Sequence, residues 1–159
     1  MLLTVCRRYA RDEAMAKDVL QETLIRIFQN IGKYKPTGSF EGWMRRIAVR
    51  RSLQWLEKSH FKHEIHAEIM PDEETTVPEI YLKMGAEDIL KLLNELPTGF
   101  RTVFNLFVVE GYNHKEIGEL LNITENTSRS QLTRARKAMQ KKLLNTQNNS
   151  HYEVAAVRK

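Results

Sequence analysis

The chain has 159 residues, of which 42% are hydrophobic and 28% charged, and its formal net charge at pH 7 is +5. This balance is typical of a soluble folded protein and excludes a disordered chain, and no apolar run approaches the roughly 20 residues that span a bilayer. The single cysteine, Cys6, excludes an internal disulfide and a multi-cysteine zinc site and fits a reducing compartment. Because Arg7 and Arg8 interrupt the N-terminus too early for a signal peptide, we expect a cytoplasmic protein without membrane insertion.

The first part of the chain is predicted to be helical. Gly32 ends a first helical segment, residues 2–31, in which residues 11–13 can form a break, and residues 33–39 then form a loop. Ser39 can cap a second helix over residues 40–61. We expect Cys6 to be a small core residue. The apolar period of 3.6 residues is carried by Ala14, Ala16, Val19, Leu20, Leu24, Ile27, Phe28 and Ile31 in the first segment, and by Trp43, Ile47, Leu53 and Leu56 in the second.

Charge changes sign twice along the chain. Residues 43–62 hold six Lys or Arg against one acid, residues 63–89 hold eight acids against one lysine, and residues 111–144 hold seven Lys or Arg against three acids. Two basic segments separated by an acidic one indicate two contacts with nucleic acid and a third surface that avoids it. The prolines Pro71 and Pro78 lie in the acidic part, which we interpret as a linker.

A helix-turn-helix is predicted near the C-terminus, after helices that start near Gly85 and at Pro97. Ile117, Leu120 and Leu121 form one apolar face of a short helix. Residues 122–124 read as a turn in which Thr124 is the N-cap of a second helix, rich in arginine, whose apolar face holds Leu132, Ala135 and Met139. In this motif the second helix lies in the major groove of DNA, although a helical hairpin with solvated arginines would show the same spacing.

We therefore predict an all-α chain of two small helical domains joined by an acidic linker, the second domain containing the helix-turn-helix. The first domain is expected over residues 1–62, the linker over 63–84 and the second domain over 85–145. Residues 146–159 show no pattern and are predicted to be a mobile tail.

Three blocks of the sequence resemble the bacterial sigma-70 family of RNA polymerase initiation factors, in its extracytoplasmic-function (ECF) group. Residues 16–23, AKDVLQET, are similar to the helix with which the family grips the polymerase clamp. Residues 38–48, GSFEGWMRRIA, are similar to the block that recognises and melts the promoter −10 element. Residues 96–104, LPTGFRTVF, together with the helix-turn-helix, are similar to the domain that reads the −35 element.

The resemblance implies three sets of site residues. The core polymerase-binding residues would be Asp18, Gln21 and Glu22. The −10 DNA-binding residues would be Lys33, Lys35, Ser39, Trp43, Arg45, Arg46, Arg50 and Arg51. The −35 DNA-binding residues would be Lys115, Thr127, Arg129, Ser130, Thr133, Arg134 and Lys137, of which Lys115 and Thr127 suit phosphate contacts.

The resemblance also implies a function without catalysis. Such a protein binds core RNA polymerase, directs it to −35/−10 promoters and assists promoter melting, with no cofactor or metal, and is commonly restrained by an anti-sigma factor. The chain departs from the family in two respects. The family normally has another helix before residues 7–9, so the first domain is expected to be short at its N-terminus, and Arg50 stands where members often carry Asn.

Two other classes of function compete with this one. A stand-alone helix-turn-helix regulator would act without polymerase and bind duplex DNA tightly by itself. An enzyme is disfavoured, because the sequence contains no phosphate-binding glycine loop, nucleophile elbow or paired catalytic carboxylates. The five histidines, His60, His63, His66, His114 and His151, could suggest a metal ion. The first three could share a helical face, but His63 and His66 lie in the predicted linker, and we do not predict a metal site.

Overall fold

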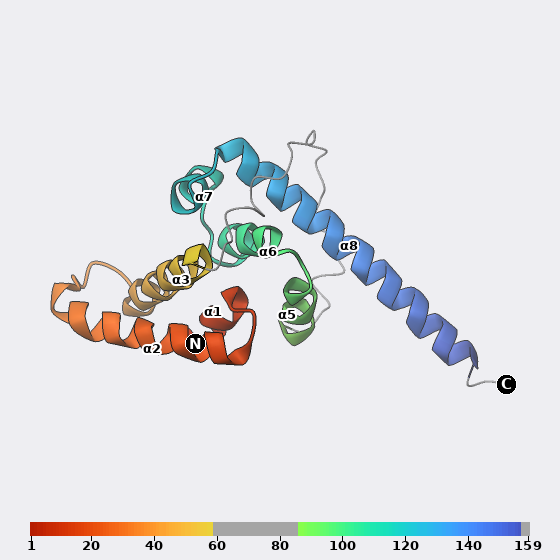
Figure 1. Cartoon of the computed structure of the whole chain (residues 1–159), viewed down its shortest axis with the longest axis horizontal. Coiled ribbons are helices and arrows are strands. Elements are labelled where there is room, and N and C mark those ends of the chain that lie inside the picture. Colours follow the sequence, from red (N-terminus) through yellow and green to blue (C-terminus); the bar gives the residue numbers. More distant parts are fainter. Residues whose placement is uncertain (59–85, 157–159) are drawn as a thin grey trace. The chain divides into compact units, whose positions relative to one another are not determined.

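The computed structural model describes the backbone of residues 1–58 and 86–156 and the side chains of residues 1–57, 89 and 91–143. The chain divides into two compact units, Met1–Glu64 and Ile65–Lys159. Every regular element in the described ranges is a helix (Figure 1), which confirms the all-α prediction. The predicted linker of residues 63–84, with its acids and its histidines, lies outside the described residues.

The first unit is a bundle of three helices that pack against one another: α1 (Leu2–Tyr9), α2 (Glu13–Asn30) and α3 (Phe40–Lys58). The expected break between α1 and α2 is present. Asp12 is the N-cap of α2, and its Oδ1 accepts a hydrogen bond of 2.8 Å from the amide of Met15. This bond satisfies one of the amides that a helix start leaves without a partner. A short 3₁₀ turn, η1 (Ile31–Lys33), ends α2.

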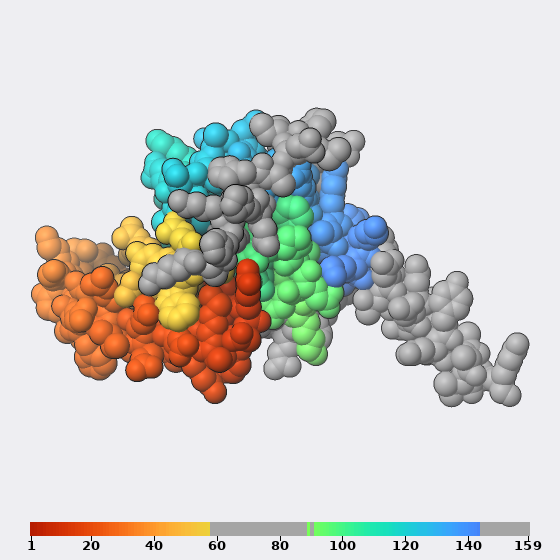
Figure 2. Space-filling view, viewed as in Figure 1, coloured from red at the N-terminus to blue at the C-terminus, as the bar shows by residue number. Residues whose placement is uncertain are grey.

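The core of the first unit is narrower than the sequence pattern predicted. On α2 the buried residues are Ala16, Val19, Thr23 and Ile27. Leu24, Phe28 and Ile31 belong to the same apolar period, but they are 40%, 74% and 51% exposed. Membership of the apolar period therefore does not bury these three side chains, because α1 and α3 cover only one side of α2. In the space-filling view α2, in orange, forms an outer surface of its unit (Figure 2).

Cys6 is fully buried, as expected, and its burial raises the pKa of its thiol. The thiol rather than the reactive thiolate is thus favoured at neutral pH. We expect iodoacetamide at pH 7.5 to leave Cys6 unmodified in the native chain and to alkylate it fully in denaturant, as measured by intact mass. Equal rates in both conditions would contradict the burial.

The second unit contains α5 (Ala86–Asn94), α6 (Thr98–Phe104), a π-helical turn η3 (Asn105–Val109), α7 (His114–Leu121) and α8 (Glu125–Ala156). Helix α8 packs against α6, α7 and α5. Gly111, at φ +77°, ends the η3 segment in a conformation that a side chain disfavours. The core of the second unit includes Leu93, Leu96, Val103, Leu106, Ile117, Leu132, Ala135 and Met139.

Helix α8 continues through most of residues 146–159, the segment that we predicted to be a mobile tail. It extends to Ala156, whereas the sequence after Leu144 shows no apolar period. A helix that is already nucleated adds residues at little cost, and residues 125–156 contain neither Gly nor Pro to end it. Whether residues 146–159 are mobile stays a prediction. In the described ranges, no helix combines the length and the apolar character that crossing a membrane requires.

Candidate nucleic-acid and protein interfaces

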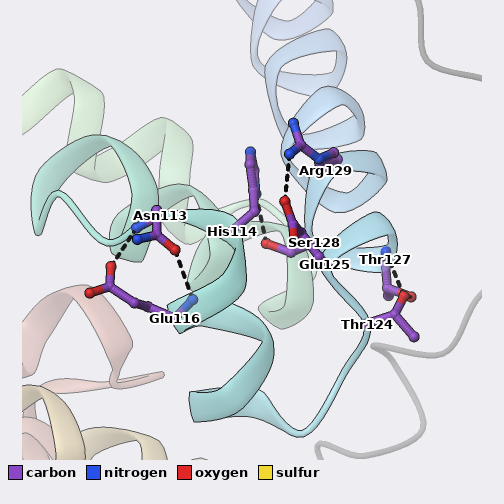
Figure 3. Close-up of polar contacts among 8 residues, drawn as sticks. All are labelled: Asn113, His114, Glu116, Thr124, Glu125, Thr127, Ser128 and Arg129. Atoms are coloured by element: carbon purple, nitrogen blue, oxygen red, sulfur yellow. Dashed lines mark hydrogen bonds and ion pairs between the residues drawn. The ribbon is translucent and has the colours of Figure 1, made fainter.

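The helix-turn-helix begins with a reciprocal pair of caps. Asn113 Oδ1 accepts a hydrogen bond of 2.9 Å from the amide of Glu116, and Glu116 Oε2 accepts one of 2.8 Å from the amide of Asn113 (Figure 3). This capping box satisfies two amides and fixes where α7 starts. At the start of α8, Thr124 Oγ1 accepts a hydrogen bond of 3.0 Å from the amide of Thr127, which confirms Thr124 as the predicted cap.

The turn between α7 and α8 depends on the absence of a side chain at Gly118. Asn122 adopts the left-handed conformation at φ 54°, and the amide of Ile123 donates a hydrogen bond of 3.0 Å to the carbonyl of Gly118. The chain thus doubles back so closely that a Cβ on Gly118 would lie 2.8 Å from the carbonyl oxygen of Ile123. The crossing of α7 and α8 therefore requires glycine at this position.

A contact that the sequence analysis missed joins the two helices of the motif. His114 Nδ1 lies 2.9 Å from Ser128 Oγ, and the His114 ring stacks on Phe107 with centroids 4.5 Å apart (Figure 3 shows the hydrogen bond). Ser128 is fully buried in the first turn of α8. No role was predicted for His114, whereas the structure makes it a link between α7 and α8. The described residues contain no group of three metal-binding side chains.

The residues predicted to read the −35 element lie in the first turns of α8 and at the start of α7. Arg129 and Lys137 are exposed, and Ser130, Thr133 and Arg134 are partly exposed. Lys115 is exposed near the start of α7. Arg129 donates a hydrogen bond of 2.5 Å to Glu125, one turn earlier. Thr127 is hydrogen-bonded through its hydroxyl to that of Thr124, at 2.8 Å. The motif thus presents a polar and mainly cationic surface beside its caps.

In the first unit, Trp43 belongs to an aromatic cluster at the start of α3. Its ring stacks on Phe40 with centroids 5.6 Å apart and lies 5.4 Å from the ring of Tyr34. The hydroxyl of Tyr34 donates a hydrogen bond of 2.5 Å to the carbonyl of Gly38, and Ser39 Oγ accepts one of 3.2 Å from the amide of Gly42. These contacts hold the loop of residues 33–39 against the helix. Trp43 itself is only partly buried.

A surface pocket of about 310 Å³ lies between α2 and α3. It is lined by Arg26, Asn30, Lys33, Trp43, Ile47, Arg50, Arg51 and Gln54. Of the predicted −10 residues, the structure therefore brings Lys33, Trp43, Arg50 and Arg51 together and leaves Lys35, Ser39, Arg45 and Arg46 outside the lining. Sequence analysis missed three lining residues, Arg26, Asn30 and Gln54. Arg26 and Asn30 belong to α2 and lie far from the −10 block in the sequence.

The predicted polymerase-binding residues lie on the outer side of α2. Asp18 and Gln21 are exposed, whereas Glu22 is partly covered and forms an ion pair with Arg51 at 3.3 Å. Ile25 and Phe28, which are 49% and 74% exposed, follow on the same face because residues three and four apart are neighbours on a helix. This mixed surface, Asp18, Gln21, Glu22, Ile25 and Phe28, is called the α2 face below.

Comparison with known families and proteins agrees with this arrangement. The sigma-70 region 2 family matches residues 1–61, and the sigma-70 region 4 family matches residues 86–139. The ECF RNA polymerase sigma factor SigE of Mycolicibacterium smegmatis is 33% identical over 141 residues, which are 83% of this chain and 53% of that protein. The ECF sigma factor SigW of Bacillus subtilis is 30% identical over 155 residues, which are 87% of this chain and 81% of that protein.

The chain thus spans about half of the first relative and about four fifths of the second. Among solved structures, the sigma factor RpoE in complex with the anti-sigma factor NepR from Bartonella quintana has a TM-score of 0.57 at 18% identity, over 89% of each chain, and shows a shared fold. Both sigma-70 region families match in the expected order, and the relatives are ECF sigma factors. The chain is therefore grouped with these factors and not with stand-alone helix-turn-helix regulators. It belongs to the ECF group of the sigma-70 family, the transcription initiation factors that act with RNA polymerase at promoters.

Proposed function

We propose that this chain binds core RNA polymerase through the α2 face, directs the polymerase to −35/−10 promoters and assists melting of the −10 element. The observation that carries the proposal is the pairing, in one chain, of a helix-turn-helix in the second unit with an aromatic and cationic pocket in the first unit. A duplex-binding regulator needs only the first of these. The proposal assigns the −10 and polymerase contacts to residues 1–62 and the −35 contacts to residues 85–145, with residues 63–84 as the acidic linker. It assigns no catalytic chemistry to the chain and places it in the cytoplasm.

The α2 face suits a protein partner because exposed apolar side chains adjoin polar ones. Ile25 and Phe28 supply apolar area whose burial in an interface releases water, worth about 25 cal/mol per Å². Gln21 and Asp18, one and two turns before Ile25 on the helix, supply groups that fix orientation. The ion pair between Glu22 and Arg51 ties this face to α3, where the proposed DNA contacts lie.

The pocket between α2 and α3 suits melted DNA. Arg26, Lys33, Arg50 and Arg51 attract phosphates, and Trp43 offers an aromatic ring to an unstacked base. Binding of unpaired bases shifts the duplex equilibrium toward the open form without ATP. Arg50 is a donor only, so it suits phosphate or guanine rather than the contacts of an asparagine.

The exposed start of α8 suits duplex DNA. Arg129 and Arg134 can donate two hydrogen bonds to a guanine, worth about 1–3 kcal/mol of discrimination. Lys115 and Thr127 suit phosphate contacts that set the register. By analogy with the RpoE neighbour, which is bound to an anti-sigma factor, we propose that an anti-sigma factor restrains this chain as well.

Trp43→Ala should impair promoter opening by the reconstituted holoenzyme. Loss of a stacking partner costs about 1–3 kcal/mol per base, so the equilibrium constant for opening should fall roughly 5- to 160-fold, and the open fraction falls with it. Permanganate footprinting of the −10 thymines measures this fraction. Trp43→Phe keeps an aromatic face and serves as control. Equal opening by the alanine variant and the wild type would remove Trp43 from the proposed site.

Co-elution with bacterial core RNA polymerase on size exclusion tests the proposed function. The wild-type chain should elute with the polymerase at one to one stoichiometry. The double variant Asp18→Ala/Glu22→Ala removes two polar groups of the α2 face and should weaken this complex. A folded chain that fails to bind polymerase but binds duplex DNA tightly would instead support the regulator.

A further inference from the structure

Glu125 is an acid at the point where a DNA-reading helix is expected to meet a polyanion. It lies in the first turn of α8, and its Oε1 accepts a hydrogen bond of 2.5 Å from Nη2 of Arg129, one turn later (Figure 3). The two side chains are 48% and 50% exposed, so both remain accessible to a ligand. The sequence analysis assigned a role to Arg129 and none to Glu125.

Helix stability does not account well for this pair. An exposed i,i+4 ion pair shifts a folding equilibrium only about twofold, and an acid in a first helical turn gains a similarly small amount from the helix dipole. Next to DNA, the same carboxylate repels phosphates and lowers the affinity for any sequence. A group that weakens general binding can still favour one sequence, since specificity is a difference between affinities.

The geometry offers such a role. Arginine has several rotatable bonds. Recognition of a guanine holds the guanidinium in one orientation, and the side-chain entropy lost in this way opposes binding. A carboxylate that holds one amino group of Arg129 restricts these rotations before DNA arrives. The guanidinium has further N–H donors besides the Nη2 group whose hydrogen bond Glu125 accepts, and these suit the acceptors of a guanine. A phosphate that would otherwise attract the arginine away from the base must compete with this carboxylate.

We infer that Glu125 is a specificity-determining residue of the −35 interface, which positions Arg129 for guanine and penalises binding to unrelated duplex. This inference rests on the proposed function. Glu125 acts through Arg129 and is a positioning residue. Its removal should therefore change which sequences are selected and should not simply weaken binding to all of them.

Selection of −35 sequences by reconstituted holoenzyme tests the inference. Wild type, Glu125→Ala, Arg129→Ala and the double variant are each presented with a duplex library randomised at the −35 element, and affinity for a scrambled duplex is measured at fixed salt. Arg129→Ala should lose guanine preference at one position. Glu125→Ala should reduce that preference about threefold or more at the same position and bind scrambled duplex about twofold more tightly. Glu119→Ala removes an exposed acid from α7 and should change neither.

The double variant should select the same sequences as Arg129→Ala alone, because Glu125 has no arginine left to position. An unchanged motif for Glu125→Ala, or a change at a position other than that of Arg129, would overturn the inference. A wild-type holoenzyme that selects no sequence at all would instead contradict the proposed function, so the two failures are distinguishable.

Discussion

Phe28→Asp should abolish co-elution of the chain with core RNA polymerase while leaving its fold intact. Phe28 is 74% exposed, so its replacement removes little of the core. In an interface the same position is buried, and a carboxylate there is desolvated without a partner. Truncation of central aromatic residues commonly costs 2 kcal/mol or more, and an added charge increases this loss. We expect the affinity for polymerase to fall about 100-fold or more.

The matched control is Val108→Asp, which introduces the same charge at a 46% exposed apolar residue of the second unit. Circular dichroism should show equal helix content for both variants, and only Phe28→Asp should lose polymerase. Retention of full affinity by Phe28→Asp would exclude the α2 face as the docking surface, whatever the effect of Asp18 and Glu22.

Gly118→Ala should destabilise the second unit and abolish −35 recognition. Replacing glycine by alanine inside a helix usually stabilises it by about 0.5–1 kcal/mol. Here the new Cβ would lie 2.8 Å from the carbonyl oxygen of Ile123, which is backbone and cannot rotate away. Overpacking costs about 1–3 kcal/mol, so the backbone clash should reverse the usual sign. The turn would open, and α8 would lose its angle to α7.

Gly42→Ala in α3 provides the comparison, because its nearest neighbour, Ser39 Cβ, would be at 3.7 Å, an ordinary contact. Thermal unfolding should show a lower midpoint for the transition of the second unit in Gly118→Ala and an equal or higher stability in Gly42→Ala. The holoenzyme carrying Gly118→Ala should no longer distinguish a −35 element from scrambled duplex. A stabilised Gly118→Ala variant would contradict the geometry of the turn.

Local sequence signals predicted the second unit well. The cap at Thr124 and the inward positions Leu132, Ala135 and Met139 follow from side-chain chemistry and helical spacing, and the structure confirms them. The contact of His114 with Ser128 was not predictable in this way. It joins residues 14 apart in the sequence and depends on how closely α7 approaches α8, which Gly118 controls.

Apolar spacing predicted the existence of α2 but overstated its buried face. Val19 and Ile27 are buried, whereas Phe28 is exposed although it fits the same period. Periodicity shows which residues share a helix face, and the neighbouring helices decide how wide a stripe they cover. The excess apolar surface is the part of the candidate polymerase site that motif matching did not reveal. Likewise, Arg26 and Asn30 line the pocket only because α2 packs on α3, which the local sequence does not reveal.

Promoter selection by core RNA polymerase tests the central claim most directly. Core polymerase would transcribe fragmented genomic DNA with and without the purified chain, and the 5′ ends of the transcripts would be sequenced. The account predicts a set of discrete start sites that appear only with the chain and share one −35 and one −10 motif upstream. Identical start sites with and without a folded chain that co-elutes with the polymerase would contradict it.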